Sequence, residues 1–289
     1  MPLNPEAILN REFPVTEEPL TDRDCMLYAL SIGLGRDPLD RDDLRYVFEG
    51  NLKAFPTMPV VLGYPGNWME DPIYGITKKM IVHGSQRLKR YKSLPIDGVI
   101  LGKNQVVNLL DKGAKRGAIM IIERRLTEKL SGDLLAVAES AIFCRADGGF
   151  GKTHEKPIHK FQQVPEVREP DISFDIPTEA NAALWYRLNG DRNPLHADPD
   201  MAETAGFDRP ILHGLCTFGL AGVAIDKAIA RKEGKSIIAL ETRFSQIVFP
   251  GETVTFDLWH SGNDISFRAR VKSRASTVLD FGRATLIAE

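Results

Sequence analysis

One short segment of the chain brings a carboxylate, an amide and an imidazole together, in the side chains of Asp191, Asn193 and His196. A glycine that can open a helix, Gly214, follows a little further on. A carboxylate and an imidazole can pass protons to and from a reacting group. Free backbone N–H groups at a helix start can hold an oxygen on which negative charge develops. The pattern therefore predicts acid–base chemistry on an activated carbonyl compound.

Asp, Asn and Pro are also common turn residues, so the same segment is compatible with a plain polar loop. We favour the functional interpretation because the loop lies between two predicted helices and precedes a His-Gly helix start. In this interpretation Asp191 and His196 divide the proton transfers around one water, and Asn193 orients that water or a side chain. Gly214 donates from its backbone. We expect His213 to be structural, since its side chain need not face the ligand.

The elements around this loop can be predicted from caps and periodicity. We expect a helix over residues 179–189, with Thr178 as its cap and Gly190 ending it in the left-handed conformation. A second helix, rich in small residues, is predicted from about His213 to Lys232. A hairpin turn is predicted at residues 261–264. The strand-like runs of this half are residues 237–240, 254–259, 265–271 and 276–287.

The first half of the chain repeats this order in a degenerate form. Residues 81–88 echo residues 211–218 at an offset of 213 − 83 = 130. We therefore expect residues 83–92 to begin a shortened equivalent of the central helix. A helix capped by Thr21 is predicted over residues 22–33. The strand-like runs of this half are residues 99–110, 118–126 and 134–144.

The two halves meet at a stretch rich in glycine, proline and charge between residues 147 and 172, which is typical of an exposed connector. We expect an N-terminal domain over residues 1–150 and a C-terminal domain over residues 151–289. One helix followed by a run of antiparallel strands in each half indicates an α+β fold.

Composition excludes several classes of function. With 37 basic and 39 acidic residues the net charge is −2, so nucleic acid is not an expected partner. No stretch approaches the roughly 18 apolar residues of a membrane span. Three scattered cysteines make a disulfide framework or a zinc site of the Cys-x-x-Cys kind improbable. The start lacks the apolar core of a signal peptide, and the end is not of the Ser-Lys-Leu type. We expect a cytoplasmic location.

Three further motifs carry little weight. Residues 146–153 resemble a phosphate-binding loop, but Ala146 replaces its first glycine and Pro157 would end the helix it needs. His154 and His159 have no cysteine or carboxylate cluster of metal-site spacing beside them, so no metal is expected. Basic residues around the first His-Gly pair are most simply a solvated face, although they could hold phosphates of an anionic ligand. They are Lys78, Lys79, Arg87, Lys89, Arg90 and Lys92.

Residues 186–196 and 205–217 resemble the signature of the hydratase 2, or MaoC-like, family. The resemblance extends over nearly the whole chain, and includes the hydratase 2 region of peroxisomal multifunctional enzyme type 2. Weaker matching pieces fall in order outside the signature. They are residues 28–30, 48–50, 55–57, 83–84, 110–113, 148–151 and 249–251.

This resemblance implies a double hot-dog fold, in which each half wraps a curved antiparallel sheet around a central helix, the N-terminal helix being shortened. It implies a lyase that reversibly hydrates trans-2-enoyl-CoA to (3R)-3-hydroxyacyl-CoA in fatty-acid β-oxidation, without metal or redox cofactor. Asp191 and His196 become the catalytic pair, Asn193 the supporting residue and Gly214 the oxyanion donor. A homodimer is also implied. The implied acyl-CoA contacts are His83, Gly84, Lys112, Arg192, Pro194, Leu195 and Phe244.

The N-terminal half departs from the signature. A shift of 130 residues back from the catalytic loop gives Val61, Gly63 and Gly66, none of which can do acid–base work. We therefore expect one active site per chain, with the N-terminal half serving binding and leaving room for a bulky acyl group. Two alternatives stay open: a thioesterase on the same fold, and a non-catalytic acyl-CoA-binding partner subunit.

Overall fold

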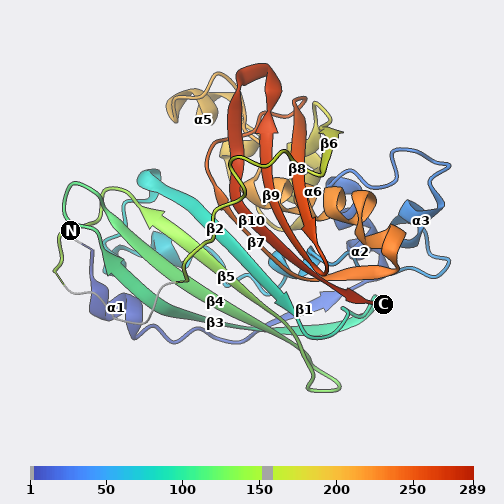
Figure 1. Cartoon of the computed structure of the whole chain (residues 1–289). Helices are drawn as coiled ribbons and strands as arrows, with labels where there is room; N and C mark the ends of the chain where they lie inside the picture. Colours follow the sequence, from blue (N-terminus) through green and yellow to red (C-terminus); the bar gives the residue numbers. More distant parts are fainter. Residues whose placement is uncertain (1–2, 152–158) are drawn as a thin grey trace.

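A single antiparallel sheet of ten strands organises the part of the chain that the computed structural model describes, residues 3–151 and 159–289 (Figure 1). Its order is β1-β3-β4-β5-β2-β7-β10-β9-β8-β6. The strands of the first half are β1 (Thr16–Leu20), β2 (Ile81–Arg90), β3 (Gly98–Asp111), β4 (Ala118–Glu128) and β5 (Leu134–Cys144). The strands of the second half are β6 (Ile172–Pro177), β7 (Lys235–Phe244), β8 (Thr253–Ser261), β9 (Asp264–Val271) and β10 (Ser276–Ala288).

Both halves have the same internal order, which confirms the repeat and gives the expected double hot-dog arrangement. In each half the first strand lies at the outer edge and the second at the centre, where β2 pairs with β7. This correspondence sets the offset of the repeat at 235 − 81 = 154 residues, not the expected 130. The loop after Gly190, which is predicted to be catalytic, is therefore matched by the segment after Gly35, not by residues 61–66.

The C-terminal half wraps around one long helix, α6 (Gly214–Ala228), which is buried on nearly every side. Its glycines allow elements of the N-terminal half to approach closely. A Cβ atom at Gly219 would lie 2.5 Å from the Ile32 side chain, and one at Gly222 would lie 2.7 Å from Thr57. Helix α2 (Asp22–Ser31) and the segment that follows it therefore pack directly on α6, so the two halves share one core.

The helix expected over residues 83–92 is wrong, because this segment is strand β2. Its side chains alternate with a period of two: Gln86 and Leu88 are buried, whereas Arg87 and Lys89 lie on the other face. In place of a central helix, α1 (Pro5–Leu9) and two 3-10 turns, Trp68–Glu70 and Pro72–Tyr74, contribute to a second apolar cluster against the N-terminal strands.

Most other expected elements are confirmed, and one cap is not. Thr21 forms a capping box with Asp24 at the start of α2, and the predicted hairpin turn joins β8 to β9. Thr178 does not cap a helix, because its hydroxyl donates to the Glu252 carbonyl at 2.8 Å and accepts from the Gly251 N–H. The next helix, α4 (Ala182–Tyr186), starts later and continues into a 3-10 turn, Arg187–Asn189. The remaining helices are α3 (Arg41–Val47) and α5 (Pro199–Thr204).

A buried ion network joins the halves away from the sheet. The Arg231 guanidinium donates to Asp43 at 2.9 Å and to Asp226 at 2.5 Å, and Lys227 Nζ lies 2.6 Å from Asp43. Asp43 belongs to α3, whereas Lys227 and Asp226 belong to α6. The pairing of these carboxylates with cations ties the two helices together, because an unpaired charge at this depth would be costly.

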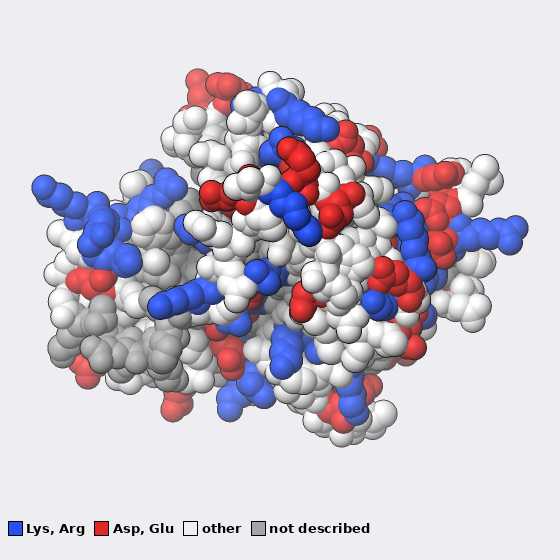
Figure 2. All heavy atoms as spheres, viewed as in Figure 1, with Lys and Arg blue, Asp and Glu red and all other residues white. Residues whose placement is uncertain are grey.

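The charged side chains on one face of the molecule do not form a patch of a single sign. On the face shown in Figure 2, basic and acidic side chains are interspersed. Among the described residues, no helix has the length and apolar character to cross a membrane. The domain boundary at residues 150 and 151 stays a prediction, and His154 lies outside the described residues.

Candidate active site

Two successive turns shape the loop that carries the predicted catalytic pair. Gly190 ends the preceding 3-10 turn with a φ of 115°, a conformation that favours glycine. The Asp191 carboxylate then accepts from the Asn193 N–H at 3.1 Å, and the Asn193 side-chain oxygen accepts from the Leu195 N–H at 3.1 Å. The structure thus gives Asn193 a local role in bending the chain, and the bend delivers His196 into the interior.

The His196 imidazole is fixed in one tautomer. Its Nδ1–H donates to the Ile211 carbonyl at 2.8 Å, since a carbonyl can only accept. The ring is 9% exposed, and this burial lowers its pKa below the usual value. His196 is therefore neutral near pH 7, and its Nε2 carries a lone pair that can accept a proton.

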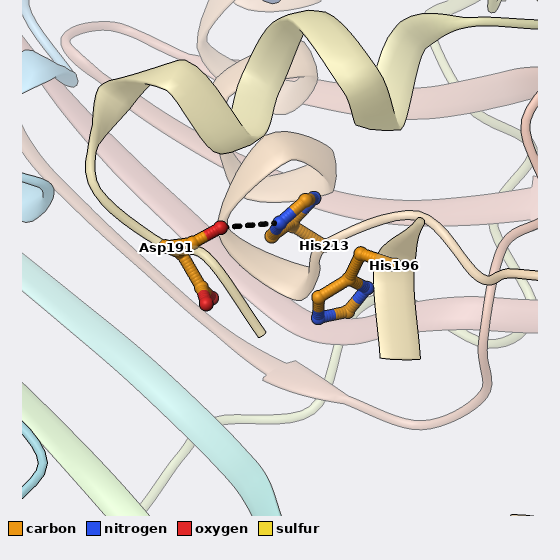
Figure 3. Close-up of side chains that lie close together, drawn as sticks. All are labelled: Asp191, His196 and His213. Carbon is orange, nitrogen blue, oxygen red and sulfur yellow. Dashed lines mark hydrogen bonds between the residues drawn. The ribbon is translucent and has the colours of Figure 1, made fainter. Parts of the chain in front are cut away.

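His213 lies directly against both members of the pair (Figure 3). Its ring stacks on His196 with 3.7 Å between the ring centroids and 25° between the planes. Its Nε2–H donates to the backbone carbonyl of Asp191 at 3.2 Å. Burial, and then the neighbouring His196, lower the pKa of His213 to about 4, so this ring is also neutral.

These three residues each offer a polar atom within 4.8 Å of the others, which is the spacing of a possible metal site. His213 Nε2 donates its proton to the Asp191 carbonyl, so this atom presents no lone pair to the cluster. What converges instead is a pair of acceptors, the Asp191 carboxylate and His196 Nε2. A water molecule, which has two O–H groups to donate, satisfies both.

The other side of the site comes from the start of α6 and from the N-terminal half. Gly214 is the first residue of α6, so its N–H is one of those without a partner inside the helix. A Cβ atom there would lie 3.4 Å from the Phe244 ring, whose centroid lies 4.8 Å from that of His83. Gly214, Phe244 and His83 are therefore neighbours, although His83 belongs to β2.

Burial lowers the pKa of His83 to about 4, and the nearby Asp191 carboxylate opposes that shift. The Nε2 atom of His83 is buried without a hydrogen-bond partner among the described residues. Asp191 also acts electrostatically on the half-exposed Tyr64. The loop of the C-terminal half that carries the predicted catalytic pair thus faces the N-terminal half directly.

The other expected ligand contacts lie at varied distances from this centre. Gly84 occupies a register shift between β2 and β5 next to His83. In the loop of the predicted catalytic pair, Arg192 and Pro194 are exposed and Leu195 is half-buried. Lys112 is exposed in the turn after β3, three strands away from β2. Much of the basic run near His83 is neutralised, with Lys78 on Glu70, Arg87 on Glu139 and Glu241, and Lys92 on Asp133.

The glycine-rich stretch around residues 148–151 already holds an anion of the protein itself. The Asp111 carboxylate accepts from the N–H groups of Gly149 at 2.7 Å and Gly151 at 2.6 Å. These bonds, with one from Gly113, lower the pKa of Asp111. The protein's own carboxylate thus takes the place that a phosphate would take in a nucleotide-binding loop.

Sequence reasoning placed Tyr28 and Tyr186 within segments that resemble the family, but it missed that their rings lie behind the histidines. The Tyr186 ring centroid lies 5.0 Å from that of His213, and the Tyr28 centroid lies 6.3 Å from that of Tyr186. Tyr28 and Tyr186 occupy matching helices of the two halves, α2 and α4. The two tyrosines are 186 − 28 = 158 residues apart, close to but not equal to the offset of 154, so only the matching of the helices could have pointed to them.

Comparison with known proteins adds two matching family profiles. The profile described as "MFE-2 hydratase 2 N-terminal domain" matches residues 19–146, and "MaoC like domain" matches residues 160–280. "Enoyl-CoA hydratase 2, peroxisomal" of Arabidopsis thaliana is 34% identical over 96% of this chain and 93% of its own length. "Probable enoyl-CoA hydratase 2" of Dictyostelium discoideum is 35% identical over 99% of this chain and 97% of its own length.

Solved structures are similar to this chain in fold and point to the same family. A MaoC-like dehydratase from Phytophthora capsici superposes with a TM-score of 0.85 at 30% identity, over 99% of this chain and 100% of that one. The full-length peroxisomal multifunctional enzyme type 2 of Drosophila melanogaster gives 0.80 at 33% identity, over 94% of this chain and 48% of the longer enzyme. A Mycobacterium tuberculosis protein described as having a double hotdog fold, 13% identical with a TM-score of 0.58, supports the fold alone.

Proposed function

Because the chain belongs to the enoyl-CoA hydratase 2 family, we propose that it reversibly adds water to trans-2-enoyl-CoA and forms (3R)-3-hydroxyacyl-CoA. The observation that carries this proposal is the pair of converging acceptors, the Asp191 carboxylate and His196 Nε2. A water that donates to both presents its oxygen lone pair to an electron-poor carbon. The Asp191 carboxylate and the neutral His196 then act as general bases near pH 7.

The addition balances with water alone. The water oxygen forms a bond to C3 as one of its protons passes to the Asp191–His196 pair. The electrons of the C2–C3 double bond move toward the thioester oxygen, where the Gly214 N–H and the positive end of α6 stabilise the negative charge. The pair then returns its proton to C2. Nothing is oxidised or reduced, so the reaction calls for no redox cofactor, and we propose that the Gly214 N–H and the start of α6 stabilise the charge without a metal.

The acyl-CoA would lie between the two halves. In this arrangement His83, Gly84 and Phe244 contact the ligand near the thioester, together with loop residues 192–195. We propose that Lys112, which lies on the outer turn after β3, contacts an extended part of coenzyme A. We propose that the N-terminal half binds substrate and carries no acid–base pair of its own.

Three wider proposals rest on the sequence and on the family. A role in β-oxidation fits a 2-enoyl thioester substrate. Two copies are expected to associate as a homodimer, which sedimentation of the purified protein tests. We propose a cytoplasmic location. Relatives that carry "peroxisomal" in their names make imaging of the tagged chain in its own cells the decisive test.

The reaction class is tested by following trans-2-enoyl-CoA of several chain lengths in two channels. Loss of the conjugated absorbance without free thiol is expected of a hydratase. Release of one free thiol per ester would instead show a thioesterase. Tight binding of the ester with neither signal would show a non-catalytic binding subunit.

A further inference from the structure

A column of four aromatic rings runs from the core of the N-terminal half to the catalytic imidazole. Its members are Tyr28, Tyr186, His213 and His196, and the successive ring centroids lie 6.3, 5.0 and 3.7 Å apart. Each member is buried, from 0% exposed at Tyr28 to 9% at His196. The Tyr28 hydroxyl is itself fixed, 2.9 Å from the Thr57 hydroxyl. The column therefore gives His196 a rigid support that reaches across both halves.

His213 is the point at which this support meets both catalytic groups. One face of its ring stacks on His196, and its Nε2–H holds the main chain of Asp191. The backbone of His213 is in turn held by α6, since its carbonyl accepts from Cys216 and Thr217 in the first turn of the helix. A rotation of the His213 ring would thus disturb the ring plane of His196 and the placement of Asp191 together.

The polar atoms of His213 and its neighbours determine which tautomer the ring adopts. His213 Nδ1 is buried without a hydrogen bond among the described residues, and so is the hydroxyl of Tyr186 beneath it. With Nε2 protonated, Nδ1 can only accept, whereas a phenol hydroxyl can donate. The Asp191 carbonyl, which can only accept, therefore sets the tautomer of His213, and neither buried atom competes for that hydrogen bond.

We propose that His213 is a positioning residue for hydration, which orients His196 by stacking and Asp191 by its hydrogen bond without touching the substrate. This inference rests on the proposed function and goes beyond the structural role expected from the sequence. The groups that act electrostatically on His213 are His196, Asp191 and Arg187, and Tyr186 packs against its ring. Near neutral pH the imidazole stack carries no charge, so it leaves the basicity of His196 intact.

The test replaces His213 in three ways. His213→Leu removes the ring and the donor, His213→Phe keeps a ring, and His213→Gln keeps a donor that can reach Asp191. We expect His213→Leu to lower kcat by about 10- to 100-fold, as displacement of catalytic groups by about 1 Å would do. KM should change by less than about threefold, because the side chain does not touch substrate. The Phe and Gln variants should each recover part of the loss.

A double-mutant cycle separates positioning from general stability. In an Asp191→Asn background, His213→Leu should lower the residual rate by less than about twofold, because the residue acts through the pair that is already disabled. An equal loss in both backgrounds would overturn the proposal. His159→Gln is the matched control, because His159 lies on the other side of the sheet and is hydrogen-bonded to Glu241. This variant should keep full kcat.

A second readout does not depend on hydration. The Nδ1 proton of His196, bonded to the Ile211 carbonyl, should give a protected NMR signal that is lost or exchanges quickly in His213→Leu. If this change occurs in a protein that hydrates no enoyl-CoA, the proposed function fails while the positioning role stands. If wild type hydrates and the variant keeps both kcat and the protected proton, the positioning role is refuted.

Discussion

Replacement of Asp191 by asparagine removes one charge and one proton acceptor while it spares the loop. The Asn193 N–H that now donates to the carboxylate at 3.1 Å can donate equally to an asparagine oxygen. The new amide nitrogen, however, presents hydrogens toward His196 Nε2, where a water needs an acceptor. Loss of a general base costs about 10²- to 10⁴-fold. With the water misplaced as well, we expect kcat to fall by about 10³- to 10⁴-fold, or about 4–5.5 kcal/mol.

The assay is the initial rate of enoyl-CoA hydration by wild type and Asp191→Asn across a substrate series. KM should change by less than about threefold, since Asp191 acts on the water. Asp198→Asn is the matched control, because Asp198 caps the next helix through its side-chain oxygen and asparagine caps equally well. It should keep full activity. More than a tenth of wild-type kcat in a folded Asp191→Asn would refute the assignment of the base.

Three further outcomes follow from burial and packing. Burial lowers the pKa of His196 below the usual 6.5, and the neutral ring is the active form, so activity should persist below pH 6.5. A midpoint of the acid limb of kcat/KM above that value would contradict this. Arg231→Ala should lower the free energy of unfolding in urea by about 3–5 kcal/mol, because buried Asp226 loses its cation and buried Asp43 keeps only Lys227. Arg125→Ala is the control, because Arg125 belongs to an exposed ion pair with Glu123. Its free energy of unfolding should stay within about 0.5 kcal/mol of wild type. Gly219→Ala should cost about 1–3 kcal/mol in the same assay, since its Cβ would lie 2.5 Å from Ile32, and an unchanged midpoint would argue against close packing of α2 on α6.

The strands were the most predictable part of the fold. Runs such as residues 118–126 combine β-branched residues with turn signals at both ends, and β4 occupies Ala118–Glu128. The prediction of a helix over residues 83–92 was wrong because it relied on the repeated His-Gly pair. The two-residue alternation of buried and outward side chains in this segment indicates a strand. The same His-Gly dipeptide starts a helix at Gly214 and lies within a strand at Gly84, so its neighbours decide its conformation.

Within the site, the sequence could predict the residues of one loop but not their surroundings. Asp191, Asn193 and His196 lie close in the chain, and their turn chemistry is local. The contact of His213 with His196 and the approach of His83 to Phe244 depend on how α6 and β2 meet across the core. Such long-range packing has no local signal in a single sequence. The Asp191–His213 hydrogen bond uses a backbone carbonyl, which no side-chain pattern can reveal.

The most direct test of the account is the configuration and isotope content of the product. Purified protein would be incubated with a trans-2-enoyl-CoA in ¹⁸O-labelled water, and the 3-hydroxyacyl-CoA would be resolved on a chiral column. The account predicts (3R)-3-hydroxyacyl-CoA with one ¹⁸O at C3 from wild type, and its loss in Asp191→Asn. An (S) or racemic product, or label recovered only in a free carboxylic acid, would contradict it.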